Sequence, residues 1–315
     1  MMTRSTEETT AEEEAAGGGE TCCASCGVAG VDNVKLKICA CGLVKYCSVA
    51  CQKDHRPQHK KMCKKQMAEI REKKLFTQPD ESHLGDCSIC CLPMSLDPAK
   101  TTLNDCCSQL ICNGCNVANA KREHEAGLEK RCAFCREPLP ATKEEGDKNM
   151  MNRVKKNDPV AMCEMAKKLC NQGNYESALQ YLTKAAELGN AEAHFVLSDL
   201  YHHGEGVEKD TKKQVYHLEE AAMKGHPEAR HDLGCIEGAK YGKFERSKKH
   251  FIIAANLGCQ DSLKLLKDLY SHGRASKEDY SDALRAYQAA VEATKSSERE
   301  EAEAYYEAID AAQQN

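Results

Sequence analysis

Sixteen side chains in the first half of the chain could bind metal ions, because fifteen cysteines and one histidine lie there at short, regular spacings. Structural zinc sites use four thiolate or imidazole ligands, often in pairs two to four residues apart. Seventeen of the 21 cysteines lie between Cys22 and Cys135. The acidic first twenty residues do not look like a secretory signal, so we expect an intracellular protein, cytoplasmic or nuclear. In such a reducing compartment, clustered cysteines bind metal more often than they form disulfides.

The first group of candidate ligands is a segment of 41 residues with eight members. They are Cys23, Cys26, Cys39, Cys41, Cys47, Cys51, His59 and Cys63. Cys22 is an alternative to Cys23, although the Cys-x-x-Cys spacing favours Cys23. A segment this short cannot bury an adequate apolar core, whereas a structural zinc site contributes about 10–16 kcal/mol. We therefore expect two zinc ions to be part of the fold here.

The run from Val44 to Cys63 carries the elements Tyr46-Cys47-Ser48, Cys51-Gln52 and His59-Lys60, and it resembles the MYND-type zinc finger. The resemblance implies interleaved sites. One zinc would be held by Cys23, Cys26, Cys47 and Cys51, and the other by Cys39, Cys41, His59 and Cys63. Because family members generally bind other proteins, often at short proline-rich segments, we expect protein partners for this module.

A second group of candidate ligands follows, with Cys91 left over. Its members are Cys87, Cys90, Cys106, Cys107, Cys112, Cys115, Cys132 and Cys135. The arrangement resembles a RING-type finger. The resemblance implies one site of Cys87, Cys90, Cys112 and Cys115, and another of Cys106, Cys107, Cys132 and Cys135. Gln109 stands where the family has histidine, so which of Cys91, Cys106 and Cys107 coordinate stays open. Together the two groups predict about four Zn²⁺ ions per chain.

RING-type fingers commonly act as ubiquitin ligases by docking a ubiquitin-conjugating enzyme. Two residues of this sequence match the docking features of the family: Ile89, between the first two cysteines, and Arg136, after the last. Ala133 departs from the usual proline, and no aromatic residue follows Cys115. The resemblance therefore supports the scaffold better than the activity, and a ligase is our alternative function.

The remainder of the chain is repetitive, with a period of 33 to 36 residues marked by Ala-Ala-x-x-Gly at Ala185, Ala221 and Ala254. A period of this length predicts a solenoid of helix pairs. The run from Leu197 to Lys213, with Leu200-Tyr201 and Gly204-x-Gly206-Val207, resembles the Sel-one-like repeat, a relative of the tetratricopeptide repeat. Such repeats generally bind partner proteins along an extended surface.

These features predict a multi-domain protein with two small zinc-stabilised modules, MYND-type and RING-like, followed by an all-α helical-repeat solenoid. The expected divisions are a disordered acidic tail (1–21), a MYND-type finger (22–63), a charged helical linker (64–86), a RING-like finger (87–140), a linker (141–157), about four repeats (158–291) and a capping helix (292–315). The charged linkers and the run of polar residues between apolar positions leave no stretch long enough for a membrane helix.

The function that this pattern favours is that of a zinc-binding adaptor or scaffold for partner proteins. We expect no catalytic residues, because the sequence has no phosphate-binding loop and no nucleophile motif. A ubiquitin-conjugating enzyme would be a partner only under the ligase alternative. The net charge of −5 argues against nucleic acid as a partner.

Overall fold

The computed structural model describes residues 22–30 and 35–313. The chain divides into two compact units at the boundary between Lys74 and Leu75, and each is considered by itself. The acidic tail expected at residues 1–21 lies outside the described residues.

The first unit combines a short hairpin with a long helix. Strands β1 (Lys37–Ile38) and β2 (Lys45–Tyr46) are antiparallel, with Lys37 opposite Tyr46. Helix α1 (Val49–Leu75) follows and has 27 residues, so it is longer than the helical piece expected near its end and it includes Pro57. The buried core consists of Tyr46 and three cysteines, Cys23, Cys39 and Cys41. This unit therefore has little apolar surface with which to stabilise itself.

The second unit begins with the other cysteine-rich module. A short η1 turn (Pro98–Lys100) precedes an antiparallel pair, β3 (Thr101–Asn104) and β4 (Gln109–Cys112), in which Thr101 lies opposite Cys112. Helix α2 (Asn113–Glu125) starts directly after β4, and the side chain of Cys112 caps it by accepting a hydrogen bond from the Cys115 backbone N–H. Two loops close on themselves through the bridges Asp86↔Pro93 and Arg131↔Pro138.

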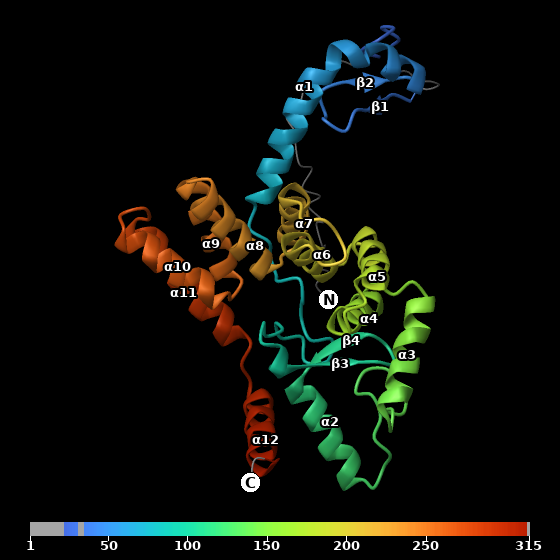
Figure 1. Ribbon diagram of the computed structural model, residues 1–315, viewed down its shortest axis with the longest axis vertical. Helices are drawn as coiled ribbons and strands as arrows, with labels where there is room; N and C mark the ends of the chain where they lie inside the picture. Colours follow the sequence, from blue (N-terminus) through green and yellow to red (C-terminus); the bar gives the residue numbers. More distant parts are fainter. Residues whose placement is uncertain (1–21, 31–34, 314–315) are drawn as a thin grey trace, which may run out of the picture. The chain divides into compact units, whose positions relative to one another are not determined.

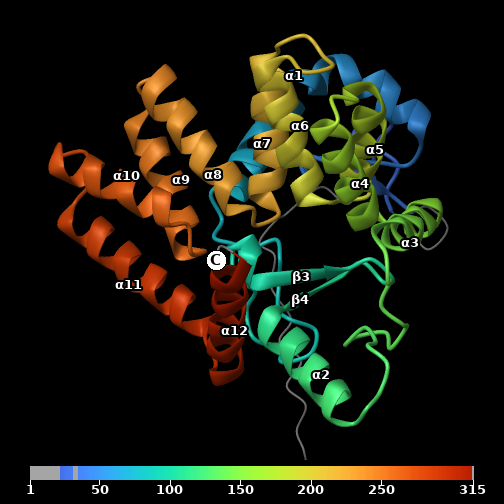
Figure 2. The same cartoon turned by 60° about the horizontal axis from the view of Figure 1, so that its bottom comes forward.

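Helices make up the rest of the second unit (Figures 1 and 2). After α3 (Lys143–Lys155) they form four successive antiparallel pairs within the described residues. The pairs are α4 (Pro159–Asn171) with α5 (Tyr175–Glu187), α6 (Ala191–His203) with α7 (Thr211–Met223), α8 (Pro227–Cys235) and its π-helical extension η2 (Ile236–Lys240) with α9 (Phe244–Asn256), and α10 (Gln260–Ser271) with α11 (Lys277–Ala293).

Two features of the repeat sequence explain how these pairs stack. The alanines of the repeated Ala-Ala element, such as Ala185, Ala221 and Ala254, are fully buried, and their small side chains let the helices approach closely. The glycine that ends each element adopts a left-handed conformation, with φ between +82° at Gly225 and +95° at Gly258. Glycine is the residue best suited to that helix C-terminus, and the turn sends the chain into the next helix.

The last helix, α12 (Ser297–Gln313), packs against α2 of the cysteine-rich module. We expected it to cap the end of the repeats instead. The close approach depends on Gly114 in α2, where an added Cβ would lie 2.9 Å from the backbone nitrogen of Arg299. Ala302 of α12 is completely buried. The C-terminal helix is thus held against the second cysteine-rich module. No helix among the described residues has the length and apolar character needed to span a membrane.

Candidate metal centres

Two groups of possible metal ligands lie in the first unit. In one group, the Sγ atoms of Cys26 and Cys51 each lie 3.5 Å from that of Cys47, and Cys23 completes the set. Cys23 and Cys26 come from the turn before β1, whereas Cys47 and Cys51 flank the start of α1. The group therefore joins two segments that the hairpin separates along the chain.

The second group of this unit contains the histidine. Its members are Cys39, Cys41, His59 and Cys63, and their ligand atoms all lie within 4.8 Å of one another. The Sγ atom of Cys39 lies 3.8 Å from that of Cys63, and Cys41 Sγ lies 3.2 Å from His59 Nε2. His59 and Cys63 are four residues apart in α1, so they share one helix face. The adjacent His55 accepts from or donates to the Tyr46 hydroxyl at 3.0 Å, and it is outside the group.

The second unit holds two further groups of four cysteines. In the first, Cys87 lies 3.9 Å from Cys115 and Cys90 lies 3.8 Å from Cys112, measured between Sγ atoms. The second group has Cys107 at 3.8 Å from Cys132 and Cys106 at 3.3 Å from Cys135. Neighbouring Cys106 and Cys107 both belong to it, with their sulfurs 4.0 Å apart.

These distances can be tested against the geometry of zinc. A Zn–S bond of about 2.3 Å in a regular tetrahedron places the sulfurs about 3.8 Å apart. The sulfur pairs named above lie 3.3 Å to 4.0 Å apart, which brackets that value, and all ligand atoms of each group lie within 4.8 Å of one another. Three groups consist of four cysteines and one of three cysteines with a histidine, and both donor sets are those of structural zinc sites. The residues present therefore fit a tetrahedral zinc ion in each group.

Of the cysteines whose role the sequence left open, Cys23, Cys106 and Cys107 belong to the four groups, whereas Cys22 and Cys91 fall outside them in the described part of the chain. Cys22 forms a backbone bridge with Ala29. Cys91 is exposed and has a positive φ of 55°. Cys22 is next to Cys23 in the chain, and Cys91 is next to Cys90. In each pair, one cysteine belongs to a group of possible metal ligands and its neighbour does not.

The backbone helps to create thiolates in two of the groups. Hydrogen bonds from the backbone N–H groups of Cys26 and Cys47 lower the pKa of Cys23 to about 6. Burial opposes ionisation of Cys87, but backbone N–H groups, led by that of Cys112, still lower its pKa to about 6. Because the thiolate is the form that binds metal, these bonds favour coordination at neutral pH.

Arg136 has a structural environment that the sequence did not reveal. Its guanidinium donates to Asn119 Oδ1 and to Glu123 Oε1, both at 2.7 Å. Glu123 is only 1% exposed and also accepts a hydrogen bond from the Arg131 backbone N–H. That N–H is the main cause of the lowered pKa of the Glu123 carboxyl. Arg136 thus fastens the last cysteine loop to α2.

A further group of possible ligands was not predicted. His83, Glu192 and His226 bring two imidazoles and one carboxylate within 4.8 Å of one another. A sequence signal was available for part of it, because Glu192 and His226 are 34 residues apart, which is one repeat period. Equivalent positions of successive repeats lie side by side, so repeat spacing could have paired these two residues.

Comparisons with known proteins identify two parts of this architecture. The family model described as the MYND finger matches residues 23–63, and the model described as the Sel1 repeat matches residues 159–190 and 191–226. No curated protein gives a significant match. The chain therefore contains a MYND finger, which binds zinc, and Sel1 repeats, and both are protein-interaction modules. The predicted fold class, cysteine-rich zinc modules followed by a helical repeat region, is confirmed.

Solved structures with some similarity include two bacterial proteins. A Sel1 repeat protein from Oxalobacter formigenes is 25% identical, with a TM-score of 0.43, and the match covers 57% of this chain and 72% of that one. The protein c5321, a protective antigen of uropathogenic Escherichia coli strains displaying an SLR fold, is 18% identical with a TM-score of 0.39. That match covers 54% of this chain and 37% of that one.

Proposed function

We propose that this protein is an adaptor whose two cysteine-rich modules are each held together by two zinc ions and whose repeats and MYND finger bind partner proteins. The observation that carries the proposal is the presence of four four-ligand groups with sulfur separations close to a tetrahedral edge. A zinc ion in such a group supplies cross-links between segments. A site with four protein ligands has no free position for a substrate, so its role is structural.

The zinc ions would substitute for an apolar core in the first unit, where buried side chains are mainly cysteines. Elemental analysis of full-length protein, purified under reducing conditions, should give about four zinc ions per chain. Chelation should abolish the structure of the two modules while most of the helical circular dichroism, which comes from the repeats, persists. Two or fewer ions per chain would contradict the proposal, as would a complete loss of helicity.

The surface of the MYND finger carries exposed apolar side chains that a partner could contact. Val49 and Met62, both in α1, are 59% and 62% exposed, and Ile38 in β1 is 63% exposed. Single exposed apolar side chains are common on protein surfaces, so the proposal of a partner here rests mainly on the MYND finger being a protein-interaction module. We assign this surface to a proline-rich segment of a partner protein, since a polyproline helix is already extended and loses little entropy on binding.

A pair of methionines in α1 allows a controlled test of this surface. Met62 lies beside the cysteine-rich part of the finger, and Met67 lies one turn beyond Cys63 with 39% exposure. A Met62→Ser variant should weaken binding of a fluorescent proline-rich peptide to the full chain, and Met67→Ser should not. Equal affinities for the wild type and Met62→Ser would show that the peptide binds elsewhere or not at all.

The RING-like module supports a second candidate function, that of a ubiquitin ligase whose repeats recruit the substrate. Ile89 and Phe134, in the first and last cysteine loops, are exposed by 42% and 45%, as a docking surface requires. Arg136 weighs against this function because Glu123 and Asn119 already engage its guanidinium. A ubiquitin-transfer assay with purified components separates the candidates. Chain formation that Ile89→Ala abolishes would favour the ligase, and inactivity of wild type with several conjugating enzymes would favour the adaptor.

A further inference from the structure

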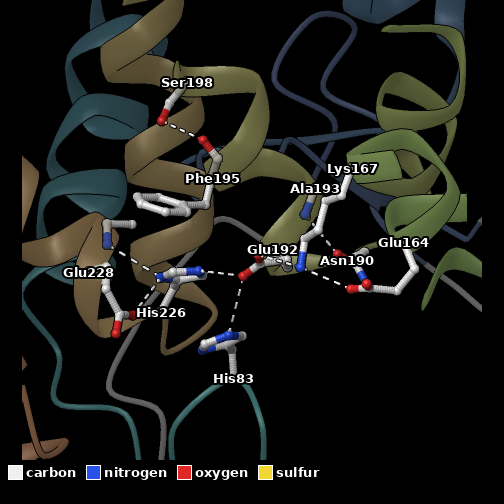
Figure 3. A network of polar contacts seen from close by, with 11 residues as sticks. His83, Glu164, Lys167, Asn190, Glu192, Ala193, Phe195, Ser198, His226 and Glu228 are labelled. Carbon is white, nitrogen blue, oxygen red and sulfur yellow. Dashed lines mark hydrogen bonds and ion pairs between the residues drawn. The ribbon is translucent and has the colours of Figure 1, made fainter. Parts of the chain in front are cut away.

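His83, Glu192 and His226 come from three separate segments of the second unit (Figure 3). His83 lies just before Cys87, Glu192 is in the first turn of α6, and His226 is the N-cap residue of α8. The Glu192 Oε2 atom is 3.0 Å from His226 Nε2 and 3.7 Å from His83 Nε2. One carboxylate oxygen therefore faces a nitrogen of each ring.

The other oxygen of Glu192 has a different partner. Lys167 of α4 places its Nζ atom 2.8 Å from Glu192 Oε1, and the same ammonium contacts Glu164 at 2.9 Å. This arrangement leaves Oε2 available as a single-oxygen ligand. It is consistent with a carboxylate that binds a metal through one atom while a neighbouring cation holds the other.

The charge around the two rings is unbalanced. Three carboxylates, those of Glu164, Glu192 and Glu228, surround one ammonium, so the formal charge with both imidazoles neutral is −2. The site thus favours an added positive charge, and a divalent cation would neutralise it.

His226 has both a carboxylate and a backbone N–H group beside its Nδ1 atom. Its Nδ1 atom lies 3.3 Å from Glu228 Oε2, on the side of the ring away from Glu192. When the Nε2 atom of a histidine binds a metal, a carboxylate that accepts from Nδ1–H fixes the ring orientation and strengthens the ligand. In this structure the His226 Nδ1 atom accepts a hydrogen bond from the Ala229 N–H at 3.3 Å, so Glu228 takes this role only once metal binding at Nε2 moves the ring proton to Nδ1.

His83 is buried without satisfying both of its nitrogens. Its side chain is 8% exposed, and its Nδ1 atom has no hydrogen-bond partner. The rings of His83 and His226 are stacked, with centroids 4.0 Å apart and planes 13° from parallel. Coordination by both rings requires the His83 ring to rotate until Nε2 points at the ion. That rotation breaks no hydrogen bond at Nδ1, because Nδ1 has no partner. A buried ring nitrogen without a partner is costly, so the present position of the ring is not strongly favoured.

A cavity adjoins this group on the side of the cysteine-rich module. Its volume is about 690 Å³, and its lining includes His83, Glu192 and His226 together with Leu103 of β3 and Phe195 of α6. Three protein ligands would leave a metal ion with an open position. A cavity beside that position gives access to water or to a ligand with an oxygen donor.

We propose that His83, Glu192 and His226 bind one divalent transition-metal ion, zinc being the first candidate, through Nε2, Oε2 and Nε2. The ion would join the segment ahead of Cys87 to helices α6 and α8, and its open position would take water or a carboxylate from a bound partner. The site differs in chemistry from the four cysteine groups because it has no sulfur ligand. Its existence does not depend on the adaptor function.

Cobalt distinguishes this site from the others, since Co²⁺ bound by nitrogen and oxygen shows visible ligand-field bands without the near-ultraviolet charge-transfer bands of thiolate coordination. Full-length protein loaded with only four zinc ions per chain, enough for the four cysteine groups, should bind one extra Co²⁺ ion with the first signature only. His83→Gln and Glu192→Gln should each weaken this binding at least about tenfold. His272→Gln, which changes an exposed histidine in α10's C-cap, should leave it unchanged.

Three results would overturn the proposal. One is the absence of an extra Co²⁺ ion, which equilibrium dialysis with elemental analysis would detect independently of the spectrum. Another is binding accompanied by thiolate charge-transfer bands, since that would mean exchange into the cysteine groups. The third is a His83→Gln variant that keeps wild-type circular dichroism and binds Co²⁺ as tightly as wild type. If that variant fails to fold, the Glu192→Gln variant provides the same comparison.

Discussion

Cys90 and Cys91 provide a direct test of the second cysteine-rich module because they are neighbours with opposite roles in the proposed site. The Sγ atom of Cys90 lies 3.8 Å from that of Cys112, whereas Cys91 is exposed and outside the four groups among the described residues. We predict that Cys90→Ser weakens zinc binding strongly and that Cys91→Ser has almost no effect.

The expected size of the effect follows from the number of ligands. A structural zinc site contributes about 10–16 kcal/mol, so an equal share for each of four thiolates is about 2.5–4 kcal/mol. Serine does not ionise at neutral pH and replaces little of this. Since about 1.4 kcal/mol corresponds to a tenfold change, Cys90→Ser should lower zinc affinity by about two to three powers of ten. The hydrogen bond from Arg299 to Cys90, at 3.3 Å, is an additional loss.

The assay is a competition between the protein and a chromophoric chelator, with the release of zinc followed as chelator is added. In wild type and Cys91→Ser, all zinc should leave at similar chelator concentrations, and in Cys90→Ser about one ion per chain should leave much earlier. If both variants release one ion early, the assignment of Cys90 over Cys91 is wrong. If neither does, this group does not hold zinc.

Two further predictions concern contacts within the second unit. Gly114→Ala should displace α12, because the added Cβ would lie 2.9 Å from the backbone nitrogen of Arg299. Amide exchange across α12 should then become faster. The control Ala118→Ser, on the exposed side of α2, should leave the exchange rate unchanged. Burial and two arginines lower the pKa of His250 to about 3, so as pH falls from 6.5 toward 3 the unfolded chain binds a proton that the folded chain does not. In urea unfolding, the free energy of unfolding should fall by up to about 1.4 kcal/mol for each pH unit in this range. The His250→Phe variant should show a smaller slope. Equal slopes in the two proteins would refute this assignment.

The resemblance to the two finger families predicted which residues the structure brings together. Each set of four inferred from the two finger resemblances forms one group, including the adjacent Cys106 and Cys107. Spacing identified the candidate ligands because a zinc site restricts how near its ligands must lie, but the interleaving of the pairs followed from the resemblance to the two finger families. Whether all sixteen residues coordinate zinc stays a prediction.

The repeats could be predicted for a different reason. Their alanines and glycines recur with the structural period, so the pattern in one pair, such as Ala221-Ala222 with Gly225, predicts the next. The interior of the helix α1 was harder to predict because Pro57 usually ends a helix. In the structure α1 continues through Pro57 to Leu75, and two members of a cysteine group, His59 and Cys63, lie on it beyond that point.

The contacts that sequence could not predict are those between segments distant in the chain. Arg299 and Cys90 are 209 residues apart, and no repeat or motif relates them. The same is true of Arg230, a fully buried arginine of α8 that donates a 2.6 Å hydrogen bond to the carbonyl oxygen of Leu75. A buried guanidinium is costly unless acceptors satisfy it, and here the carbonyl of Leu75, the first residue of the second unit, is one such acceptor.

These distant contacts give the second cysteine-rich module a defined position against the repeats. The backbone N–H of His83 donates to the Gly225 carbonyl at 2.9 Å, and an added Cβ at Gly225 would lie only 2.6 Å from the Glu81 carbonyl oxygen. Arg299 of α12 donates to the carbonyl of Pro93 at 2.7 Å, within the same loop that holds Cys90. Zinc at Cys90 would order this loop and therefore the acceptors that hold α12. Loss of that zinc should therefore release the C-terminal helix as well as unfold the module. Amide exchange in α12 would then report whether the site is occupied, although α12 contributes no ligand to it.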